Sequence, residues 1–296
     1  MTSADDRALI PRPDEPLPTG SDKTRSVQAM FDVIAPRYDL VNRVMTFRMD
    51  VGWRRRTVSA LGLPPGSLVV DLACGTGNVA LELARRGARV TGFDGAPRLL
   101  EVAADRFAAE GLAGEWVQGD LTDLPFEDDS FEIITSVFGA IFTSSPRDTA
   151  AEIGRVLRPQ GRAAITTWIE EGLFQHMQEM SKIAVAKHFG TAPQEDAPEA
   201  FAWGEEDQVR ELFLENGVAM QVETHELVIE EESARVLNDR WFDLHPIWLT
   251  MKEIIGEETY EVLRRETLPV VEAANQAGDG SFRYAMRYLL FEGSPV

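Results

Sequence analysis

A short glycine-rich segment, "DLACGTGNVA" at residues 71–80, combines residue types that can hold a nucleotide-like ligand. Gly75, Gly77 and Ala80 follow the spacing G-x-G-x-x-G/A, in which a tight turn brings a helix N-terminus close to a phosphate or nucleoside. This spacing is typical of dinucleotide-binding turns, but other nucleoside cofactors use the same shape. The charges of the neighbouring side chains must therefore indicate which ligand the turn holds.

Acidic side chains follow three successive predicted strands. Asp71 ends the first strand, where a carboxylate repels a pyrophosphate and attracts an ammonium group. Asp94 ends the second strand, about 20 residues after the first glycine, and is suited to accept hydrogen bonds from both ribose hydroxyls. Asp120 ends the third strand and can accept from an adenine amino group, while Leu121 packs against the ring. Because parallel strands bind ligands at their carboxyl ends, these carboxylates favour S-adenosylmethionine.

The elements around these residues alternate regularly between strand and helix. Such alternation predicts a doubly wound α/β sheet, because each step between parallel strands needs a crossover. The predicted strands are 68–72, 88–93, 115–118, 131–137 and 162–168, and the predicted helices are 78–86, 96–109 and 147–157.

The rhythm changes after Trp168. An apolar helical face starts at Leu173, a helix is predicted over 206–215, and strands over 219–229 and 282–291 are separated by a long, mainly helical insertion. We expect this insertion to cover the substrate. The predicted organisation is a disordered tail at 1–22, lid helices at 23–62, a cofactor-binding core at 63–230 and 280–296, a helical cap at 231–279, and a further insertion at 170–205.

Composition limits the classes of protein to which the chain can belong. No apolar stretch approaches the roughly 20 residues that span a bilayer, no secretory signal is visible, and the single Cys74 excludes an internal disulfide framework. The net charge is −20, concentrated after Glu170, and such a surface repels phosphate backbones. We therefore expect a cytoplasmic enzyme with a small-molecule partner, no nucleic acid and no membrane span; a homodimer is one option for its assembly.

Four segments together resemble the successive motifs of class I S-adenosylmethionine-dependent methyltransferases: "DLACGTG", "GFDGA", "GDLTDLPF" and "EIGRVLRPQGR". The upstream segment "MFDVIAPRYDLVNRVMTFRMDVGWRRRTV" is similar to the N-terminal part of the ubiquinone/menaquinone C-methyltransferase family. The resemblance implies a Rossmann-like, mostly parallel seven-stranded sheet with a reversed last strand. The residues that the motifs and their neighbours place at the cofactor are Tyr38, Asp71, Ala73, Gly75, Thr76, Gly77, Asp94, Gly95, Asp120, Leu121 and Ser136.

The acceptor site is expected beside the same crevice. The segment "SVFGAIFTSS" keeps Phe138 and Gly139 of the quinone family but lacks the arginine–asparagine pair that follows them there. His245, on the predicted cap, is the candidate for orienting or deprotonating an acceptor, although aromatic residues at the spacing of its neighbours more often form a packed cap core. The candidate acceptor-contacting residues are Phe138, Phe142, Trp168, His176 and Trp241.

These observations predict methyl transfer to a small molecule, directed to oxygen or nitrogen. Two alternatives remain open. The N-terminal resemblance favours C-methylation of a quinone precursor, and the lack of a clear general base leaves room for a relative that binds S-adenosylmethionine without transferring its methyl group.

Overall fold

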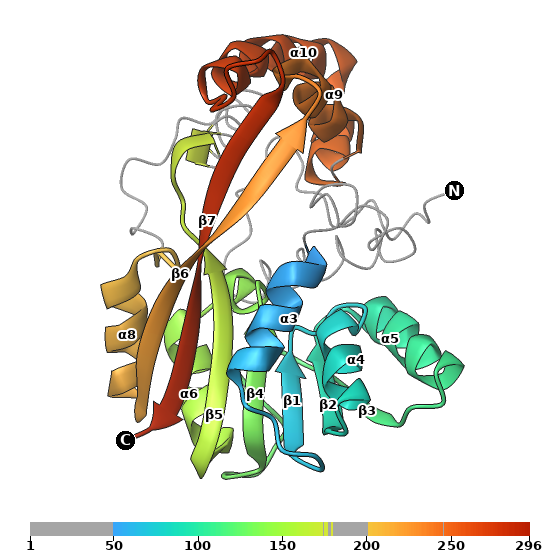
Figure 1. The fold of residues 1–296 in the computed structure, drawn as a ribbon. Coiled ribbons are helices and arrows are strands. Elements are labelled where there is room, and N and C mark those ends of the chain that lie inside the picture. Colours follow the sequence, from blue (N-terminus) through green and yellow to red (C-terminus); the bar gives the residue numbers. More distant parts are fainter. Residues whose placement is uncertain (1–49, 174, 177–178, 180–200, 245) are drawn as a thin grey trace.

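The computed structural model describes residues 50–173, 175–176, 179, 201–244 and 246–296 (Figure 1). The predicted tail and most of the predicted lid lie outside these residues. The element order is α3 (Asp50–Ala60), β1 (Leu68–Leu72), α4 (Asn78–Arg85), β2 (Arg89–Asp94), α5 (Pro97–Ala109), β3 (Gly114–Gln118), β4 (Phe131–Val137), the 3₁₀ helix η3 (Ala140–Phe142), α6 (Pro146–Val156), β5 (Leu157–Trp168), α8 (Glu206–Glu215), β6 (Val218–Glu231), α9 (Ala234–Leu244), α10 (Pro246–Ala273) and β7 (Phe282–Pro295).

The strands form one seven-stranded sheet in the order β3-β2-β1-β4-β5-β7-β6. Strands β1 to β5 pair in parallel, whereas β7 runs antiparallel to both β5 and β6. The predicted doubly wound, mostly parallel sheet with a reversed last strand is confirmed. Strand β1 is buried along almost its whole length, as expected for a central parallel strand covered on both faces.

Helices cover both faces of the sheet (Figure 1). On one face, Val58 of α3 and Leu83 of α4 pack against Val69 and Ile133 of the sheet. On the other face, α6 and α8 pack against the aliphatic residues that alternate with these, among them Val70, Ile134 and Ile165. Burial of these two apolar layers fixes the carboxyl ends of β1, β2 and β4 along one edge of the molecule.

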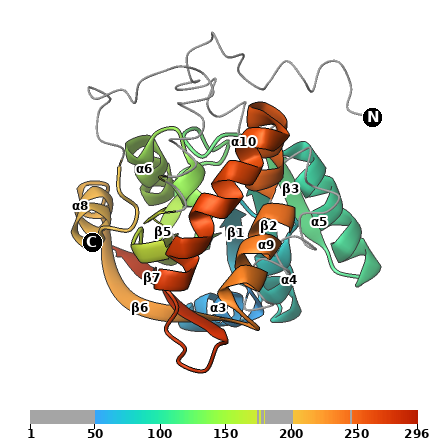
Figure 2. The ribbon, with the colours of Figure 1, turned by 90° about the horizontal axis from the view of Figure 1, so that it is seen from above.

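Strands β6 and β7 are longer than the rest and form a ribbon that carries the cap. They pair from Val218 with Pro295 to Glu231 with Phe282, whereas the pairing of β5 with β7 already ends at Trp168 and Tyr288. Figure 1 shows this ribbon rising beyond the carboxyl ends of the parallel strands, with α9 and α10 at its tip, and Figure 2 shows α10 crossing over the sheet.

The cap has an apolar core of its own. Phe242 of α9 lies 4.7 Å from Trp248 and 5.2 Å from Tyr260 between ring centroids, and the cluster includes Phe282 of β7. Helix α10 is broken at Gly256, whose φ of 78° is the left-handed conformation that glycine adopts without strain.

Candidate functional site

The glycine turn between β1 and α4 has an unusual backbone. Ala73, Gly75 and Gly77 all have positive φ, at 52°, 55° and 74°. A Cβ at Gly77 would lie 2.8 Å from Cβ of Ala103 in α5, so this position needs glycine both for its conformation and for the close approach of the two helices. The turn thereby lets α4 begin close against α5.

Asp94, at the end of β2, connects this turn to the next one. Its Oδ2 accepts a hydrogen bond from the Gly75 N–H at 2.8 Å, and its Oδ1 accepts one from the Ala96 N–H at 2.9 Å. Asp94 is only 9% exposed. A carboxylate has about four acceptor sites, so these two backbone bonds are compatible with acceptance from ribose hydroxyls.

Asp71 has a different environment from the one expected. Instead of facing open space at the end of β1, it is 1% exposed, and its oxygens accept from Thr135 Oγ1 at 2.7 Å and from the Ala80 N–H at 3.1 Å. Burial raises its pKa to about 7, against the lowering effect of these two hydrogen bonds. The expectation that this carboxylate faces the ligand directly is therefore corrected: it ties β1 to β4 and to the first turn of α4.

The remaining predicted cofactor residues lie near the same edge. Asp120 accepts from the N–H and the hydroxyl of Thr122, and Leu121 packs partly buried against the core. Gly95, whose carbonyl accepts from Gln118 Nε2, follows Asp94 directly. Ser136 is fully buried, with its Oγ accepting from the Ala140 N–H at 2.9 Å, so it holds η3 in place.

Two of the predicted acceptor residues form an aromatic cluster at the ends of β4 and β5. The rings of Phe138 and Trp168 stack at 4.1 Å, and Trp53 of α3 contacts both edge-on, at 5.0 and 5.6 Å. Tyr288 of β7 closes the cluster, and its hydroxyl accepts from the Arg56 guanidinium at 2.7 Å. Phe138 has a positive φ of 57°, which marks a constrained position for a non-glycine residue.

Sequence reasoning did not select Trp53, Arg56, Tyr288 or His225 as site residues. His225 of β6 lies 5.3 Å from the Tyr288 ring, and burial together with the nearby Arg56 charge lowers its pKa. The pairing of His225 with Tyr288 across the antiparallel ribbon brings the two rings together. The sequence predicts strands over 219–229 and 282–291, but it does not predict their register.

The other predicted site residues do not belong to this aromatic cluster. Phe142 is 43% exposed at the end of η3, and Nε2 of His176 is buried without a hydrogen-bond partner among the described residues. Trp241 packs against the cap core, which is the packing role weighed as the alternative. His245 and Tyr38 lie outside the described residues.

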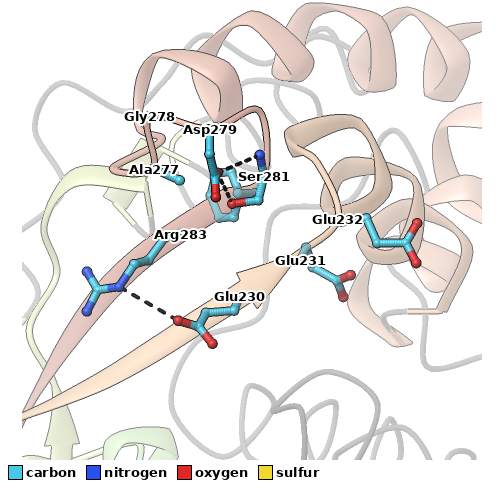
Figure 3. A pocket seen from close by; sticks show the side chains of 9 residues that line it. Glu230, Glu231, Glu232, Ala277, Gly278, Asp279, Ser281 and Arg283 are labelled. Atoms are coloured by element: carbon cyan, nitrogen blue, oxygen red, sulfur yellow. Dashed lines mark hydrogen bonds and ion pairs between the residues drawn. The ribbon is translucent and has the colours of Figure 1, made fainter.

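An acidic pocket of about 820 Å³ lies at the cap end of the ribbon (Figure 3). Glu230 forms a 3.8 Å ion pair with Arg283, and Asp279 accepts hydrogen bonds from the N–H and hydroxyl of Ser281. Within the described part of the chain, no group of three or more His, Cys, Asp or Glu side chains is arranged to hold a metal ion. The pocket lies at the opposite end of the ribbon from Val218 and Pro295, and the glycine turn contributes no residue to its lining.

The family of the chain follows from a sequence comparison. The profile of the ubiE/COQ5 methyltransferase family matches residues 19–190, more than half of the chain. The chain belongs to this family. It is accordingly an enzyme of the class I S-adenosylmethionine-dependent methyltransferase type, in agreement with the sheet order and the glycine turn.

Several relatives are similar to this chain over about half of its length or more. The ubiquinone/menaquinone biosynthesis C-methyltransferase UbiE of Geotalea daltonii is 38% identical over 164 residues, 53% of this chain and 70% of the relative. The demethylmenaquinone methyltransferase of Deinococcus radiodurans is 38% identical over 152 residues, 51% of this chain and 63% of the relative. An uncharacterized protein of Mycobacterium bovis is 28% identical over 234 residues, 79% of this chain and 83% of the relative.

Solved structures resemble the fold over most of the chain. The [4+2]-cyclase SpnF has a TM-score of 0.63 at 18% identity, covering 95% of this chain and 98% of its own. A putative methyltransferase of Bacillus halodurans has a TM-score of 0.55 at 20% identity, covering 82% of this chain and 99% of its own. At these identities the likeness shows the fold alone. Among the described residues, no helix is long and apolar enough to cross a membrane.

Proposed function

We propose that this ubiE/COQ5 family member binds S-adenosylmethionine at the glycine turn and transfers its methyl group to a small aromatic acceptor. The observation that carries the proposal is the Asp94 carboxylate, which bonds the Gly75 N–H and the Ala96 N–H at the edge of the left-handed turn. A nucleoside carrying two vicinal hydroxyls matches an acceptor at this position.

The ribose and the adenine of the cofactor each have a suited partner along this edge. Asp94 would hold the ribose, and Asp120 with Leu121 would hold the adenine. Gly75 and Gly77 allow the ligand to approach the backbone, because a side chain there would be strained. Tyr38 remains the proposed lid residue. Asp71 acts through the turn that it anchors rather than by contact.

The cofactor supplies a methyl group already activated by its attachment to a sulfonium. The protein therefore needs mainly to align the acceptor atom in line with the methyl group and to exclude water. The rings of Phe138, Trp168 and Trp53 form an aromatic, apolar wall at the carboxyl ends of β4 and β5. Such a wall suits a planar ring as acceptor, and aromatic faces also attract a nearby positive charge.

A ring carbon is the favoured acceptor atom. The relatives with 38% identity are a C-methyltransferase of ubiquinone and menaquinone biosynthesis and a demethylmenaquinone methyltransferase. A hydroquinone ring is planar and electron-rich, and its carbon loses a proton after methylation, so a positioned base would assist. His245 is retained as a candidate for that base.

An oxygen or nitrogen acceptor is the second candidate. The family match ends at residue 190, before the ribbon and the cap that cover the acceptor side of the sheet. The polar pair after Phe138 and Gly139 is replaced by Ala140 and Ile141. Both features separate the acceptor site of this chain from the part that the quinone methyltransferases share.

Two measurements test the proposal. Calorimetric titration with S-adenosylhomocysteine is expected to show saturable binding, and NADH is expected to show none; the reverse result would overturn the cofactor assignment. Methyl-labelled S-adenosylmethionine, incubated with a demethylated quinol and separately with phenol and amine acceptors, would then identify the acceptor. Label on the quinol ring carbon supports C-methylation, label on oxygen or nitrogen supports the second candidate, and no transfer to any acceptor from a cell extract would indicate a non-methylating relative.

A further inference from the structure

Two charged side chains of α6, both within the segment "EIGRVLRPQGR", reach the loop between β3 and β4. Glu152 and Arg155 bond each other first: Arg155 Nε donates to Glu152 Oε1 at 2.8 Å, and its Nη2 donates to Oε2 at 2.6 Å. The Glu152 and Arg155 side chains are 17% and 31% exposed. The hydrogen bonds from Arg155 lower the pKa of Glu152, so the two side chains are held as an ion pair. We call these two residues the α6 pair.

The α6 pair binds the backbone of this loop. Glu152 Oε2 accepts from the Leu124 N–H at 2.7 Å, and Arg155 Nη2 donates to the Leu124 carbonyl at 3.0 Å. Arg155 Nη1 donates to the Phe126 carbonyl at 2.7 Å and to Asp128 Oδ1 at 2.9 Å. All five N–H donors of the guanidinium thus have an acceptor. A lysine ammonium lacks the planar fork that makes these bonds together.

The other end of the loop is attached at the candidate cofactor site. The Gly119 N–H donates to the Asp94 carbonyl at 3.2 Å. Asp120 and Leu121, which are proposed to hold the adenine, follow directly in the chain. Asp120 Oδ1 accepts from the N–H and the hydroxyl of Thr122 at 3.0 and 2.8 Å, which leaves Oδ2 to accept from an adenine amino group.

Apolar packing attaches the loop independently of these hydrogen bonds. Leu124 is 3% exposed, and the Phe126 ring lies 4.9 Å from the ring of Phe131 and 5.9 Å from that of Phe93. Without the α6 pair the loop should therefore stay attached but lose its exact position, because burial is not directional and hydrogen bonds are. Asp120 lies just before Leu124 in the chain, so its carboxylate would shift with the backbone.

We propose that the α6 pair sets the position of the Asp120 carboxylate and so determines how strictly the site selects adenine over other purines. The inference rests on the proposed function, in which Asp120 accepts from the adenine amino group. Glu152 and Arg155 are positioning residues, because they bond the loop and act on the base through it. A displacement of about 1 Å is enough to lose such a hydrogen bond, since its strength falls steeply with distance and angle.

Two ligands that differ at one position of the base test the inference. Calorimetric titration of the whole chain would compare S-adenosylhomocysteine with S-inosylhomocysteine, in which a carbonyl oxygen replaces the amino group. We expect the wild type to prefer the adenosyl ligand about 30-fold or more, because the inosyl ligand replaces a charge-assisted hydrogen bond with a contact between two acceptors. Arg155→Met should reduce this preference to about five-fold or less. Arg155→Lys should recover part of it.

Arg158→Met is the matched control, because Arg158 belongs to the same segment and bonds the far end of the same loop. Its Nε donates to the Asp129 carbonyl at 3.0 Å, and its Nη1 donates to Glu132 Oε1 at 3.1 Å. This variant should keep the wild-type preference. The ratio of the two affinities separates positioning from a general loss of structure, because a variant that only destabilises the fold weakens both ligands alike.

A double substitution shows whether Arg155 acts through Asp120. Asp120→Asn keeps an oxygen for Thr122 but presents an amide donor to the base, so the preference for the adenosyl ligand should disappear. Adding Arg155→Met to Asp120→Asn should then change the ratio of affinities by less than about two-fold, because the interaction that Arg155 positions is already absent.

A full preference in a folded Arg155→Met would overturn the inference and leave the cofactor assignment intact, and so would equal binding of both ligands by the wild type. Failure of the wild type to bind S-adenosylhomocysteine would instead overturn the proposed function. If Arg155→Met does not fold, Glu152→Gln decides the outcome, because it keeps an acceptor for the Leu124 N–H but removes the charge that holds Arg155. It should lower the preference, and an unchanged preference in this variant would also overturn the inference.

Discussion

The proposed cofactor edge, which is the glycine turn together with Asp94, and the cap are stabilised in different ways. At the cofactor edge, hydrogen bonds between polar groups hold the turn, as Asp94 does for Gly75 and Ala96. In the cap, large apolar side chains pack together, as Phe242 does with Trp248 and Tyr260. The first arrangement fixes positions of donors and acceptors, and the second provides a stable body at the end of a two-stranded ribbon. Substitutions in each region should therefore have separable effects on binding and on stability.

The largest expected effect is that of Phe242→Ala in the cap. Phe242 is fully buried and its ring packs against Trp248 and Tyr260, so the truncation leaves a cavity in a well-packed core. We expect a loss of about 3–5 kcal/mol in the free energy of unfolding, measured with urea. The affinity for S-adenosylhomocysteine should change less than two-fold in the folded variant.

Leu244→Ala provides the control for this experiment, because Leu244 is exposed at the end of the same helix. It should shift stability by less than about 0.5 kcal/mol. A parallel fall in cofactor affinity and stability in Phe242→Ala would show that the cap and the cofactor edge are one cooperative unit.

The sequence predicts the elements that have a local pattern and misses features that depend on contacts between distant segments. Strands 68–72 and 131–137 and the helix 206–215 match the structure, because each has a local pattern of apolar residues bounded by turn residues. Strand β5 begins at Leu157 rather than at 162, since Leu157 pairs with Phe131 of β4 and leaves the helix. A pairing between distant segments leaves no such local signal.

At the candidate site, too, the sequence predicts local features but not contacts between distant segments. The glycine turn and Asp94 were recognisable from spacing, because they act within one strand–turn–helix unit. The bond from Thr135 to Asp71 and the bond from Arg56 to Tyr288 join residues 64 and 232 positions apart. They depend on strand order and register, which the single sequence does not specify. This is why Asp71 was expected to face the ligand.

Asp94→Ala tests the cofactor edge. Removing the carboxylate leaves the Gly75 and Ala96 N–H groups without their acceptor and removes the proposed partner of the ribose hydroxyls. We expect the affinity for S-adenosylhomocysteine to fall by about 2–4 kcal/mol, a thirty-fold or greater loss in calorimetry. Asp94→Asn should lose less, because one oxygen can still accept. Unaltered binding by a folded Asp94→Ala would remove Asp94 from the cofactor site.

The buried Asp71 carboxyl should make the stability of the cofactor edge depend on pH. Its pKa is about 7 in the folded chain and near 3.8 when unfolded, so between these values the folded protein binds more protons than the unfolded chain. The contribution of this group to stability is therefore present at low pH and declines as pH rises towards 7, by up to about 1.4 kcal/mol per pH unit.

Asp71→Asn isolates this effect, because the amide cannot ionise. Urea unfolding of both proteins between pH 5 and pH 8 should show the variant gaining stability relative to the wild type as pH rises to 7, by about 2 kcal/mol from pH 5 to pH 7. Loss of one hydrogen bond adds a constant difference at every pH. Parallel curves over this interval would mean that the Asp71 pKa is not raised.

The smallest expected effect lies where the two regions meet. Tyr288 belongs to the ribbon that carries the cap, yet its ring contacts Phe138 and Trp168, the proposed acceptor wall, and its hydroxyl bonds Arg56 of α3. Tyr288→Phe keeps the ring and removes that bond, which should cost about 0.5–1.5 kcal/mol in urea unfolding, because the exposed Arg56 side chain can be hydrated instead. If the hydroxyl and Arg56 hold α3 against the acceptor wall, KM for the acceptor should rise by about three- to ten-fold, with cofactor affinity unchanged. Arg56→Met should give the same KM change, and combining the two substitutions should add little, since they remove one interaction. Additive effects of the two variants would instead assign Arg56 and Tyr288 separate roles, and a loss of cofactor affinity would extend the cofactor edge as far as β7.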